Sequence, residues 1–399
     1  MRARSNFRND AAERAMRSLL PCEPVCQNLT IRRDESRGGF VATGFETENE
    51  CHPPALSPIP RVVEAPALAR HLSDPDDFVH DTQRRGRRVT QPSLKLGTRG
   101  SPLALVQANL VREALCAAHG WDRDRVEIVT IRTTGDRRQD VALAEIGGKA
   151  LWTKELDRAL RCGEIDFAVH SMKDVETGRP DAITIAAMLP RADVRDRIIG
   201  ADSVGALRDG AVVGTSSPRR VAQVKRLRPD LVTILLRGNV DTRLAKVAGG
   251  EVDATLLAAA GLERLGRVEV GSCIPIDVML PAAAQGAVGI EARTDDDRVR
   301  TLLAAIDDVP THACVLLERA LLAVLQADCH SPVAALATLA DDGEGGTTMT
   351  LRGELFAEDG SAHVAGVVDG ALGDPALAAR LGADLLDRAP PAVRSLFAG

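Results

Sequence analysis

A short apolar segment that runs into polar and charged groups is the clearest place in this chain where chemistry could be done. Phe167 to Val169 has the apolar character of a buried strand, and the segment ends in Lys173 and Asp174. A strand there would carry both charged side chains to its carboxyl end, where open α/β folds bind ligands. For this segment alone, a solvated loop is an equal alternative. The pair is therefore a site candidate that needs partners elsewhere in the chain.

Basic residues are concentrated between positions 215 and 246, where eight Lys or Arg stand against two Asp. A solvated helix face accounts for Lys225, Arg226 and Arg228. Five arginines in or just beyond this region instead lie at or shortly after predicted strand ends: Arg219, Arg220, Arg237, Arg243 and Arg264. The planar guanidinium pairs with carboxylates and phosphates through two hydrogen bonds. The pattern therefore predicts a polyanionic ligand.

Two strand-to-helix junctions supply further groups that favour anions. After a predicted strand at 94–97, Arg99 lies in a loop, and Ser101 followed by proline is typical of a helix start. Ser217, which is also followed by proline, would likewise start the helix after a predicted strand at 211–214. Backbone N–H groups and the helix dipole attract anions at such junctions. Lys149 follows two glycines but lacks the flanking residues of a Walker loop.

Predicted strands and helices alternate along the chain, which indicates an α/β fold with a cleft between two domains. One domain would contribute Arg99, Ser101, Lys149, Lys173 and Asp174, and the other the arginines. The predicted strands cover 94–97, 126–131, 168–169, 211–214, 231–236, 254–259, 349–355 and 363–368. The predicted helices cover 153–161, 315–325 and 375–388. The helix after Ser101 is expected to bury four residues: Leu103, Val106, Leu110 and Val111.

Composition narrows the class of protein. At 399 residues the chain is long enough for two or three domains. The net charge of −6, the aromatic content of 2% and the lack of Tyr argue against nucleic acid as a partner. Eight cysteines without zinc-ligand spacing argue against a metal site or a disulfide framework. With no secretory signal and no apolar run of membrane-spanning length, we expect a cytoplasmic protein that binds no membrane.

Residues 1–92 differ from the rest of the chain. Arg, Asp, Pro and Ser dominate, and hydrophobic periodicity is lacking. The composition predicts a disordered extension. A docking or targeting tail, an inert tail and a start codon assigned too far upstream are the alternatives.

Several ordered motifs resemble those of the porphobilinogen deaminase (hydroxymethylbilane synthase) family. The resemblance begins near Leu94 and extends to the C-terminus. The motifs are GTRGSPLAL at 97–105, IGGK at 146–149, VHSMKD at 169–174, GTSSPRR at 214–220, LRGNV at 236–240 and QGAVG at 285–289.

The resemblance implies an α/β fold of three domains. The first two would resemble the lobes of type II periplasmic binding proteins, and the third would be a small open-faced α/β domain that carries the cofactor cysteine. The expected bounds are 93–189 plus 287–304 for the first domain, 193–281 for the second and 308–399 for the third, after the extension at 1–92.

The resemblance also implies an activity. The enzyme would join four porphobilinogen molecules, release ammonia at each step, and free hydroxymethylbilane with water. Asp174 matches the catalytic aspartate, and Cys329 matches the cysteine that holds a dipyrromethane cofactor through a thioether. Ten residues match positions that bind cofactor and substrate: Arg99, Ser101, Lys149, Lys173, Ser217, Arg219, Arg220, Arg237, Arg243 and Arg264. A cytoplasmic monomer is expected.

Five positions depart from the family pattern. Asp328 stands where glycine is usual before the cysteine, and its charge is expected to raise the pKa of the thiol. Ala284 replaces a glycine. Glu145, Asp241 and Thr134 each make the predicted anion site less positive. These changes keep one alternative open, a degenerate paralogue that binds pyrroles without efficient turnover. The first two domains suggest another, a two-lobed protein that binds small anions.

Overall fold

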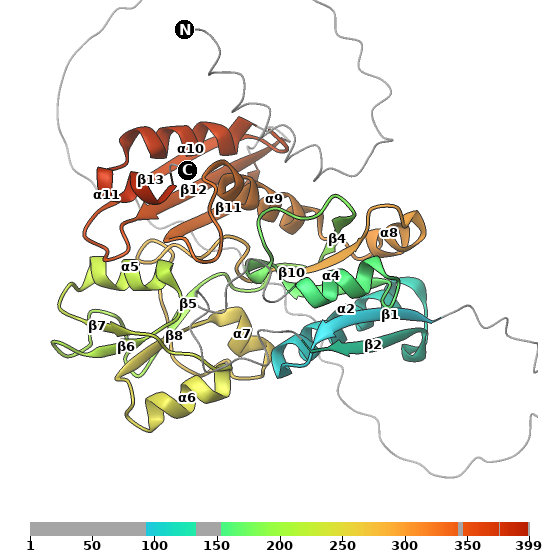
Figure 1. Ribbon diagram of the computed structural model, residues 1–399, viewed down its shortest axis with the longest axis horizontal. Helices are drawn as coiled ribbons and strands as arrows, with labels where there is room; N and C mark the ends of the chain where they lie inside the picture. The colour runs from blue at the N-terminus through green and yellow to red at the C-terminus, as the bar shows by residue number, and fades with distance from the viewer. Residues whose placement is uncertain (1–92, 133–152, 342–345, 375, 398–399) are drawn as a thin grey trace, which may run out of the picture. The chain divides into compact units, whose positions relative to one another are not determined.

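The computed structural model describes residues 93–132, 153–341, 346–374 and 376–397 (Figure 1). In this part of the chain the strands form three sheets, with the orders β2-β1-β3-β10-β4, β7-β6-β8-β5-β9 and β11-β12-β13. Helices accompany each sheet, which confirms the predicted α/β fold. The predicted extension at 1–92 lies outside the described residues. The predicted domain bounds stay a prediction.

The first sheet joins two distant parts of the sequence. Its strands are β1 (Leu94–Arg99), β2 (Val126–Ile131), β3 (Phe167–Ser171), β4 (Ile183–Met188) and β10 (Val288–Arg293). β1 runs parallel to β2 and β3, whereas β10 is antiparallel to both β3 and β4 and lies between them. The accompanying helices are α2 (Pro102–His119), α4 (Lys154–Arg161) and α8 (Asp297–Ala304). Short 3-10 turns occur at Arg123–Arg125 and Met172–Asp174.

Helix α2 begins where the sequence predicts, but it buries a different face. The Ser101 hydroxyl accepts a hydrogen bond from the Ala104 N–H (3.3 Å), as a helix cap does. Val111 is buried as expected, whereas Leu110 is 40% exposed, so that prediction was wrong. At about 100° per residue, Leu110 lies on the side of Val111 that faces away from Ala108 and Leu115. The buried face holds Gln107, Ala108, Val111, Leu115 and Cys116.

The second sheet carries most of the basic segments. Its strands are β5 (Asp196–Ile199), β6 (Val212–Gly214), β7 (Val232–Ile234), β8 (Ala254–Ala258) and β9 (Ser272–Cys273). The helices are α5 (Pro218–Leu227), α6 (Val240–Ala248) and α7 (Ala259–Arg264). β7 is shorter than the predicted strand at 231–236 because it is an edge strand that pairs only with the three residues of β6.

The third sheet is an antiparallel meander of β11 (Val333–Asp341), β12 (Thr347–Phe356) and β13 (His363–Ala371). Helices α9 (Val309–Val324) and α10 (Ala376–Arg388) cover one face of it (Figure 1), and α11 (Pro391–Phe397) follows. Leu321, Leu351 and Leu381 are fully buried in the shared core. α9 begins earlier than the predicted 315 because Asp308 caps it and Pro310 occupies its first turn.

Among the described residues, no helix combines the length and the apolar character needed to cross a membrane. The same residues hold no group of three or more His, Cys, Asp or Glu placed to bind a metal ion.

Candidate active site

Lys173 and Asp174 lie at the carboxyl end of β3, as the sequence predicts. The strand itself is buried from Phe167 to His170, and the following 3-10 turn carries both charged residues. Both side chains are half-buried. The Lys173 ammonium donates to the Gln285 Oε1 at 3.4 Å. The end of β3 thus carries one cation and one carboxylate next to each other, and both are partly shielded from solvent.

Arg219 and Arg220 are buried side by side in the first turn of α5. Both donate to one buried carboxylate, Asp196: Arg219 Nη2 to Oδ2 and Arg220 Nη2 to Oδ1, each at 2.7 Å. Arg219 also donates to the Leu280 carbonyl (2.9 Å), and Arg220 to that of Leu256 (2.8 Å). The pair therefore carries two positive charges against one negative charge.

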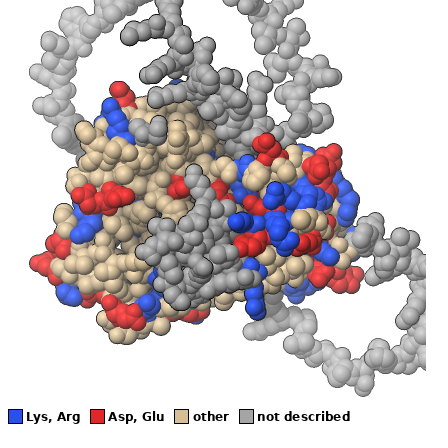
Figure 2. All heavy atoms as spheres, viewed as in Figure 1, with Lys and Arg blue, Asp and Glu red and all other residues tan. Residues whose placement is uncertain are grey.

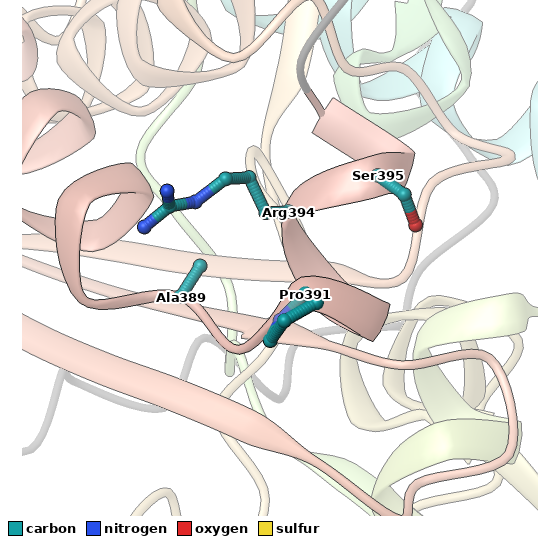
Figure 3. A pocket seen from close by; sticks show the side chains of 4 residues that line it. All are labelled: Ala389, Pro391, Arg394 and Ser395. Carbon is teal, nitrogen blue, oxygen red and sulfur yellow. The ribbon is translucent and has the colours of Figure 1, made fainter.

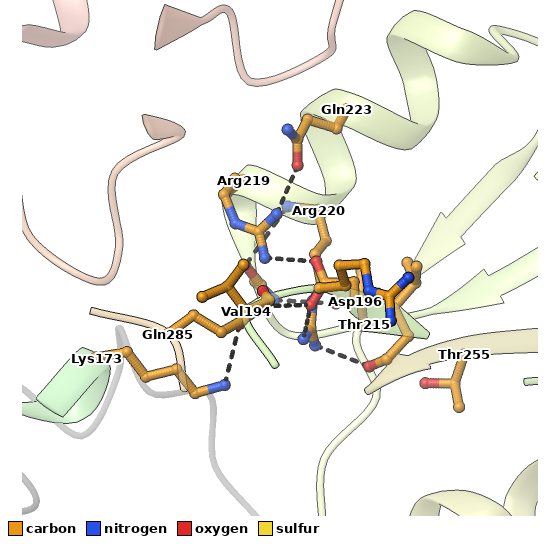
Figure 4. Close-up of polar contacts among 12 residues, drawn as sticks. Lys173, Val194, Asp196, Thr215, Arg219, Arg220, Gln223, Thr255 and Gln285 are labelled. Atoms are coloured by element: carbon orange, nitrogen blue, oxygen red, sulfur yellow. Dashed lines mark hydrogen bonds and ion pairs between the residues drawn. The ribbon is translucent and has the colours of Figure 1, made fainter. Parts of the chain in front are cut away.

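Gln285 connects this arginine pair to Lys173 (Figure 4). Its Nε2 donates to Asp196 Oδ1 (2.8 Å) and to the Val194 carbonyl (2.7 Å), while its Oε1 faces the Lys173 ammonium. We call Lys173, Asp196, Arg219, Arg220 and Gln285 the cationic cluster. It joins the end of β3 in the first sheet to β5 and α5 at the second sheet.

Ser217, Arg243 and Arg264 lie next to this cluster. Ser217 caps α5 by accepting from the Arg220 N–H (3.4 Å). Arg243 donates to the Ser216 hydroxyl (3.2 Å) and to the Gly238 carbonyl (3.0 Å), and Arg264 donates to the Gly286 carbonyl (2.6 Å). Arg99 ends β1, and Arg237 follows β7. Lys149 lies outside the described residues, as do Thr134 and Glu145.

Positive charge in this region is in excess. Burial, and then the Arg220 guanidinium, lowers the pKa of Lys173 to about 8, although Asp174 and Asp196 oppose the shift. Burial and Arg220 also lower the pKa of Arg243 to about 10, and Asp174 again opposes the shift. The arginine pair has the reverse effect on its partner, holding the pKa of Asp196 well below its ordinary range despite burial. The site is therefore suited to anions.

Cys329 lies in the loop between α9 and β11. The residue is exposed, yet the chain around the thiol is dense enough that desolvation raises its pKa to about 12. The charges of Asp174 and Asp328 add to this rise, so the expected effect of Asp328 is confirmed as a smaller contribution. Asp328 also shapes the loop, because its Oδ1 accepts from the His330 N–H (2.8 Å). His330 is exposed.

The segment after Asp174 is tied to the start of the Cys329 loop. The Thr177 hydroxyl donates to the Ala327 carbonyl at 2.9 Å. The buried Arg319 of α9 donates to the carbonyls of Val175 (3.1 Å) and Glu176 (2.5 Å). These bonds explain why the charge of Asp174 acts on the thiol although the two residues are far apart in sequence.

A second buried ionic group includes His170 and Glu176, which stand before and after Asp174 in the chain. Arg179 donates to Glu291 (2.7 Å), Asp157 (2.5 Å) and Glu176 (2.8 Å), and His170 Nε2 lies 3.1 Å from Glu291 Oε2. We call these five residues the acidic cluster. Although burial raises the pKa of Glu291, its pairing with His170 and Arg179 outweighs this and lowers the pKa to about 2. The cluster fixes Glu176, two residues after Asp174.

Two of the departures from the family pattern have a structural account. Asp241 pairs with Arg267 at the surface, so its charge is compensated there. Ala284 has φ of 61°, a left-handed conformation that favours glycine, and its N–H donates to Glu318 (2.6 Å). Sequence reasoning missed the contacts that Asp196 and Gln285 make with Lys173, Arg219 and Arg220. Gln285 opens a motif already singled out, and Asp196 had no signal beyond an acid between arginines.

Two hollows in the described part of the chain lie outside the cationic cluster. The lining of one includes Arg191, Asp193, Arg197 and Glu263. The other, at the C-terminal end, is lined by Ala389, Pro391, Arg394 and Ser395 (Figure 3) and contains no carboxylate or thiol. In the view of Figure 2, Lys and Arg over α4 and α8 alternate with Asp and Glu. Ion pairs such as Arg158 with Glu164 account for this mixing. The candidate site therefore rests on the β3 end and its neighbours.

Two family models match the chain. The model of the porphobilinogen deaminase, dipyromethane cofactor binding domain matches residues 94–301, and that of the porphobilinogen deaminase C-terminal domain matches residues 312–389. A porphobilinogen deaminase from Sphingopyxis alaskensis is 58% identical over 310 residues, which are 76% of this chain and 96% of that protein. The enzyme of the same name from Nitrobacter hamburgensis is 47% identical, with 76% and 96% covered.

Some solved structures of bacterial proteins are more distantly similar. The periplasmic VFT2 domain of Bordetella pertussis BvgS covers 57% of this chain and 92% of its own, with 15% identity and a TM-score of 0.32. The ligand-binding component of an ABC-type import system from Staphylococcus aureus covers 59% and 79%, with 14% identity and a TM-score of 0.33.

Proposed function

The chain belongs to the porphobilinogen deaminase family, and from this premise we propose that it polymerises porphobilinogen into hydroxymethylbilane, with Asp174 as the catalytic carboxylate. One observation carries the assignment. Asp174 is close enough to Lys173 and Arg243 on one side, and to the Cys329 thiol on the other, that its charge changes the pKa of all three. A carboxylate in that position can serve a ligand that is anchored at the cysteine and held by cations.

The donor set fits a dipyrromethane cofactor, which carries several carboxylates. Buried Nε–H groups of Arg219 and Arg220 have no acceptor among the described residues. Lys173 and Arg243 lie in a region of excess positive charge that carboxylates would neutralise. Cys329 is exposed in the loop whose start is bonded to Thr177, so it is the proposed thioether anchor. When bound, the cofactor supplies the chain end that the enzyme extends.

Asp174 would act where positive charge develops. As the aminomethyl C–N bond of porphobilinogen breaks, its electron pair leaves with ammonia, and the pyrrole ring becomes cationic. The methylene carbon that carried the amine then bonds to a ring carbon of the neighbouring pyrrole, and that ring carbon loses its proton. A fixed carboxylate stabilises such a cation most strongly where water is scarce. Asp174 can also accept a hydrogen bond from the ring N–H and help transfer the proton that the neighbouring pyrrole loses.

The remaining predicted residues are proposed to bind carboxylates of cofactor and substrate. Arg243 and Lys173 are the best supported, because both face the Asp174 charge and neither side chain is joined to a carboxylate in the described contacts. Arg219 and Arg220 would bind through their remaining Nε–H groups. The full proposed set also includes Arg99, Ser101, Lys149, Ser217, Arg237 and Arg264. A cytoplasmic monomer without nucleic-acid or membrane partners remains part of the proposal.

Intact mass spectrometry tests the proposal directly. The protein and its Cys329→Ser variant would be purified from a host that makes porphobilinogen. We expect a mass excess that matches one dipyrromethane in the parent and none in the variant. Cys162→Ser is the matched control, because Cys162 is also an exposed thiol. A parent without an adduct after incubation with porphobilinogen would contradict the proposal and favour a paralogue that binds pyrroles without turnover.

A further inference from the structure

Gln285 is the single side chain that contacts both Lys173 and Asp196 in the described part of the cationic cluster. It lies in the connection from β9 to β10, where the chain returns from the second sheet to the first. It is 1% exposed, and its own backbone carbonyl accepts from Arg191 Nε (2.9 Å). The Gln285 residue is therefore held both at its backbone carbonyl and at its side-chain amide.

The neighbours of Gln285 fix the orientation of its amide. The Val194 carbonyl and the Asp196 carboxylate can only accept, so the NH₂ group must face them. The Lys173 ammonium can only donate, so the amide oxygen must face it. One amide thus donates to the buried carboxylate and accepts from the cation at the strand end.

The neutrality of this amide has a chemical consequence. Lys173 is held at 3.4 Å by a neutral oxygen, so its positive charge remains available for a ligand. A carboxylate at position 285 would pair with Lys173 and cancel that charge, and it would also repel Asp196. An apolar side chain would leave the ammonium without this acceptor. A glutamine supplies an acceptor for the ammonium and adds no negative charge.

We propose that Gln285, supported by Asp196, is a positioning residue that orients Lys173 beside Asp174 and keeps the ammonium charge free for a substrate or cofactor carboxylate. This inference rests on the function proposed above. It assigns a role to the junction between the two sheets, because Gln285 links the Lys173 turn to β5 and, through Asp196, to the arginine pair of α5.

The pH dependence of turnover provides a readout that a purely structural role would not move. The pKa of Lys173 is lowered to about 8, so the ammonium and the activity that needs it are lost as pH rises through that value. The charged groups facing Lys173 are Arg219 and Arg220 from α5, Asp196 from β5 and Asp174 from its own turn. A change at Gln285 replaces none of these groups, and Asp196 is the one among them that Gln285 contacts.

Two substitutions should move the alkaline limb of the kcat/KM profile in opposite directions. Gln285→Glu adds a negative charge next to the ammonium, which raises the pKa of Lys173 and moves the limb to higher pH. Gln285→Met removes an acceptor that favours the charged form, which moves the limb to lower pH. We expect each shift to be about 0.5 pH unit or more, with an increase in KM for Gln285→Glu and a several-fold fall in kcat for Gln285→Met.

Gln223→Met is the matched control. Gln223 is also a buried glutamine of the neighbourhood, and it contacts Arg219 (2.7 Å) and the Leu280 carbonyl (3.0 Å) but not Lys173. The same substitution there removes buried hydrogen bonds without touching the ammonium, so the alkaline limb should stay in place.

The outcomes separate this inference from the proposed function. If the parent carries the adduct and turns over, but the limb stays fixed in both Gln285 variants or moves equally in Gln223→Met, the positioning role is overturned. A parent without adduct or turnover contradicts the proposed function first. If Gln285→Glu does not fold, as thermal melting would show, the shift to lower pH in Gln285→Met decides the question.

Discussion

Two buried ionic clusters flank the turn that carries Asp174, and they are opposite in charge. In the cationic cluster, the single carboxylate of Asp196 forms ion pairs with two arginines, and Lys173 adds a third cation. In the acidic cluster, the single guanidinium of Arg179 forms ion pairs with three carboxylates. Both are shielded from water, so both are expensive to leave unbalanced.

The difference indicates which cluster is the better candidate for a ligand site. Arg179 binds all three carboxylates of its cluster, and His170 provides Glu291 with a further partner. The cationic cluster, in contrast, retains positive charge and unpaired Nε–H groups within the described residues. The acidic cluster therefore has the features of a fixed support for the Asp174 turn, and the cationic cluster those of an anion site.

Removal of one carboxylate from each cluster should give the largest contrast in stability. Asp196→Asn leaves two buried guanidiniums without a counter-charge, and we expect a loss of about 3–5 kcal/mol in the free energy of unfolding. Asp157→Asn leaves Arg179 with Glu176 and Glu291, and we expect a loss of about 1 kcal/mol. Urea denaturation of both variants measures the difference. Equal losses would show that the two clusters are not distinguished by charge balance.

Asp174→Asn should separate catalysis from stability. The substitution keeps size and shape, so the protein should fold and retain its cofactor, while turnover falls about 100- to 1000-fold because the developing cation loses its carboxylate. Steady-state kinetics with porphobilinogen measure this. Glu176→Gln is the paired variant on the acidic side, where we expect a loss of stability with most turnover retained. An Asp174→Asn enzyme at near-parent rates would refute the catalytic assignment.

Acid titration should detect the acidic cluster through Glu291. Its folded-state pKa is about 2, below the ordinary value of 4.5, so its stabilising contribution is complete above about pH 4.5 and is lost as pH falls towards 2. Glu291→Gln should therefore flatten the decline of stability with pH in that window. The remaining slope would come from the other carboxylates whose pKa is depressed, among them Asp196 and Asp253. Urea midpoints at a series of pH values give the measurement, and an unchanged slope would contradict the assigned pairing.

The smallest effect is expected from a charge outside both clusters. Asp241 forms an exposed ion pair with Arg267, and such pairs contribute about 0–1 kcal/mol. Asp241→Asn should change the melting temperature and kcat/KM very little. A clear gain in porphobilinogen affinity would instead mean that Asp241 weakens the anion site, as its place in the sequence predicts.

The local rules of the sequence predicted much of the fold near the site. Ser101 and Ser217 cap helices as their spacing indicates, and β3 delivers Lys173 and Asp174 to its carboxyl end. These features depend on neighbouring residues only. The motifs also predicted the family to which the chain belongs.

Contacts between distant segments could not be predicted in this way. The pairing of Asp196 with Arg219 and Arg220 depends on how β5 packs against α5, and the bond from Thr177 to Ala327 spans 150 residues. Sequence patterns report burial and periodicity but not partners across the fold. Leu110 illustrates the same limit, because an apolar residue on a helix does not reveal which face the core will cover.

The position of β10 has a consequence for synthesis on the ribosome. β10 lies between β3 and β4 in the first sheet, although it follows β4 by about 100 residues in the chain. Until Arg293 has emerged, β4 has no partner among the described strands of that sheet, and β3 lacks its neighbour on one side. A nascent chain released before this point would expose strand edges that invite aggregation. Completion of the first sheet, and with it the support for Asp174, is thus a late event in translation.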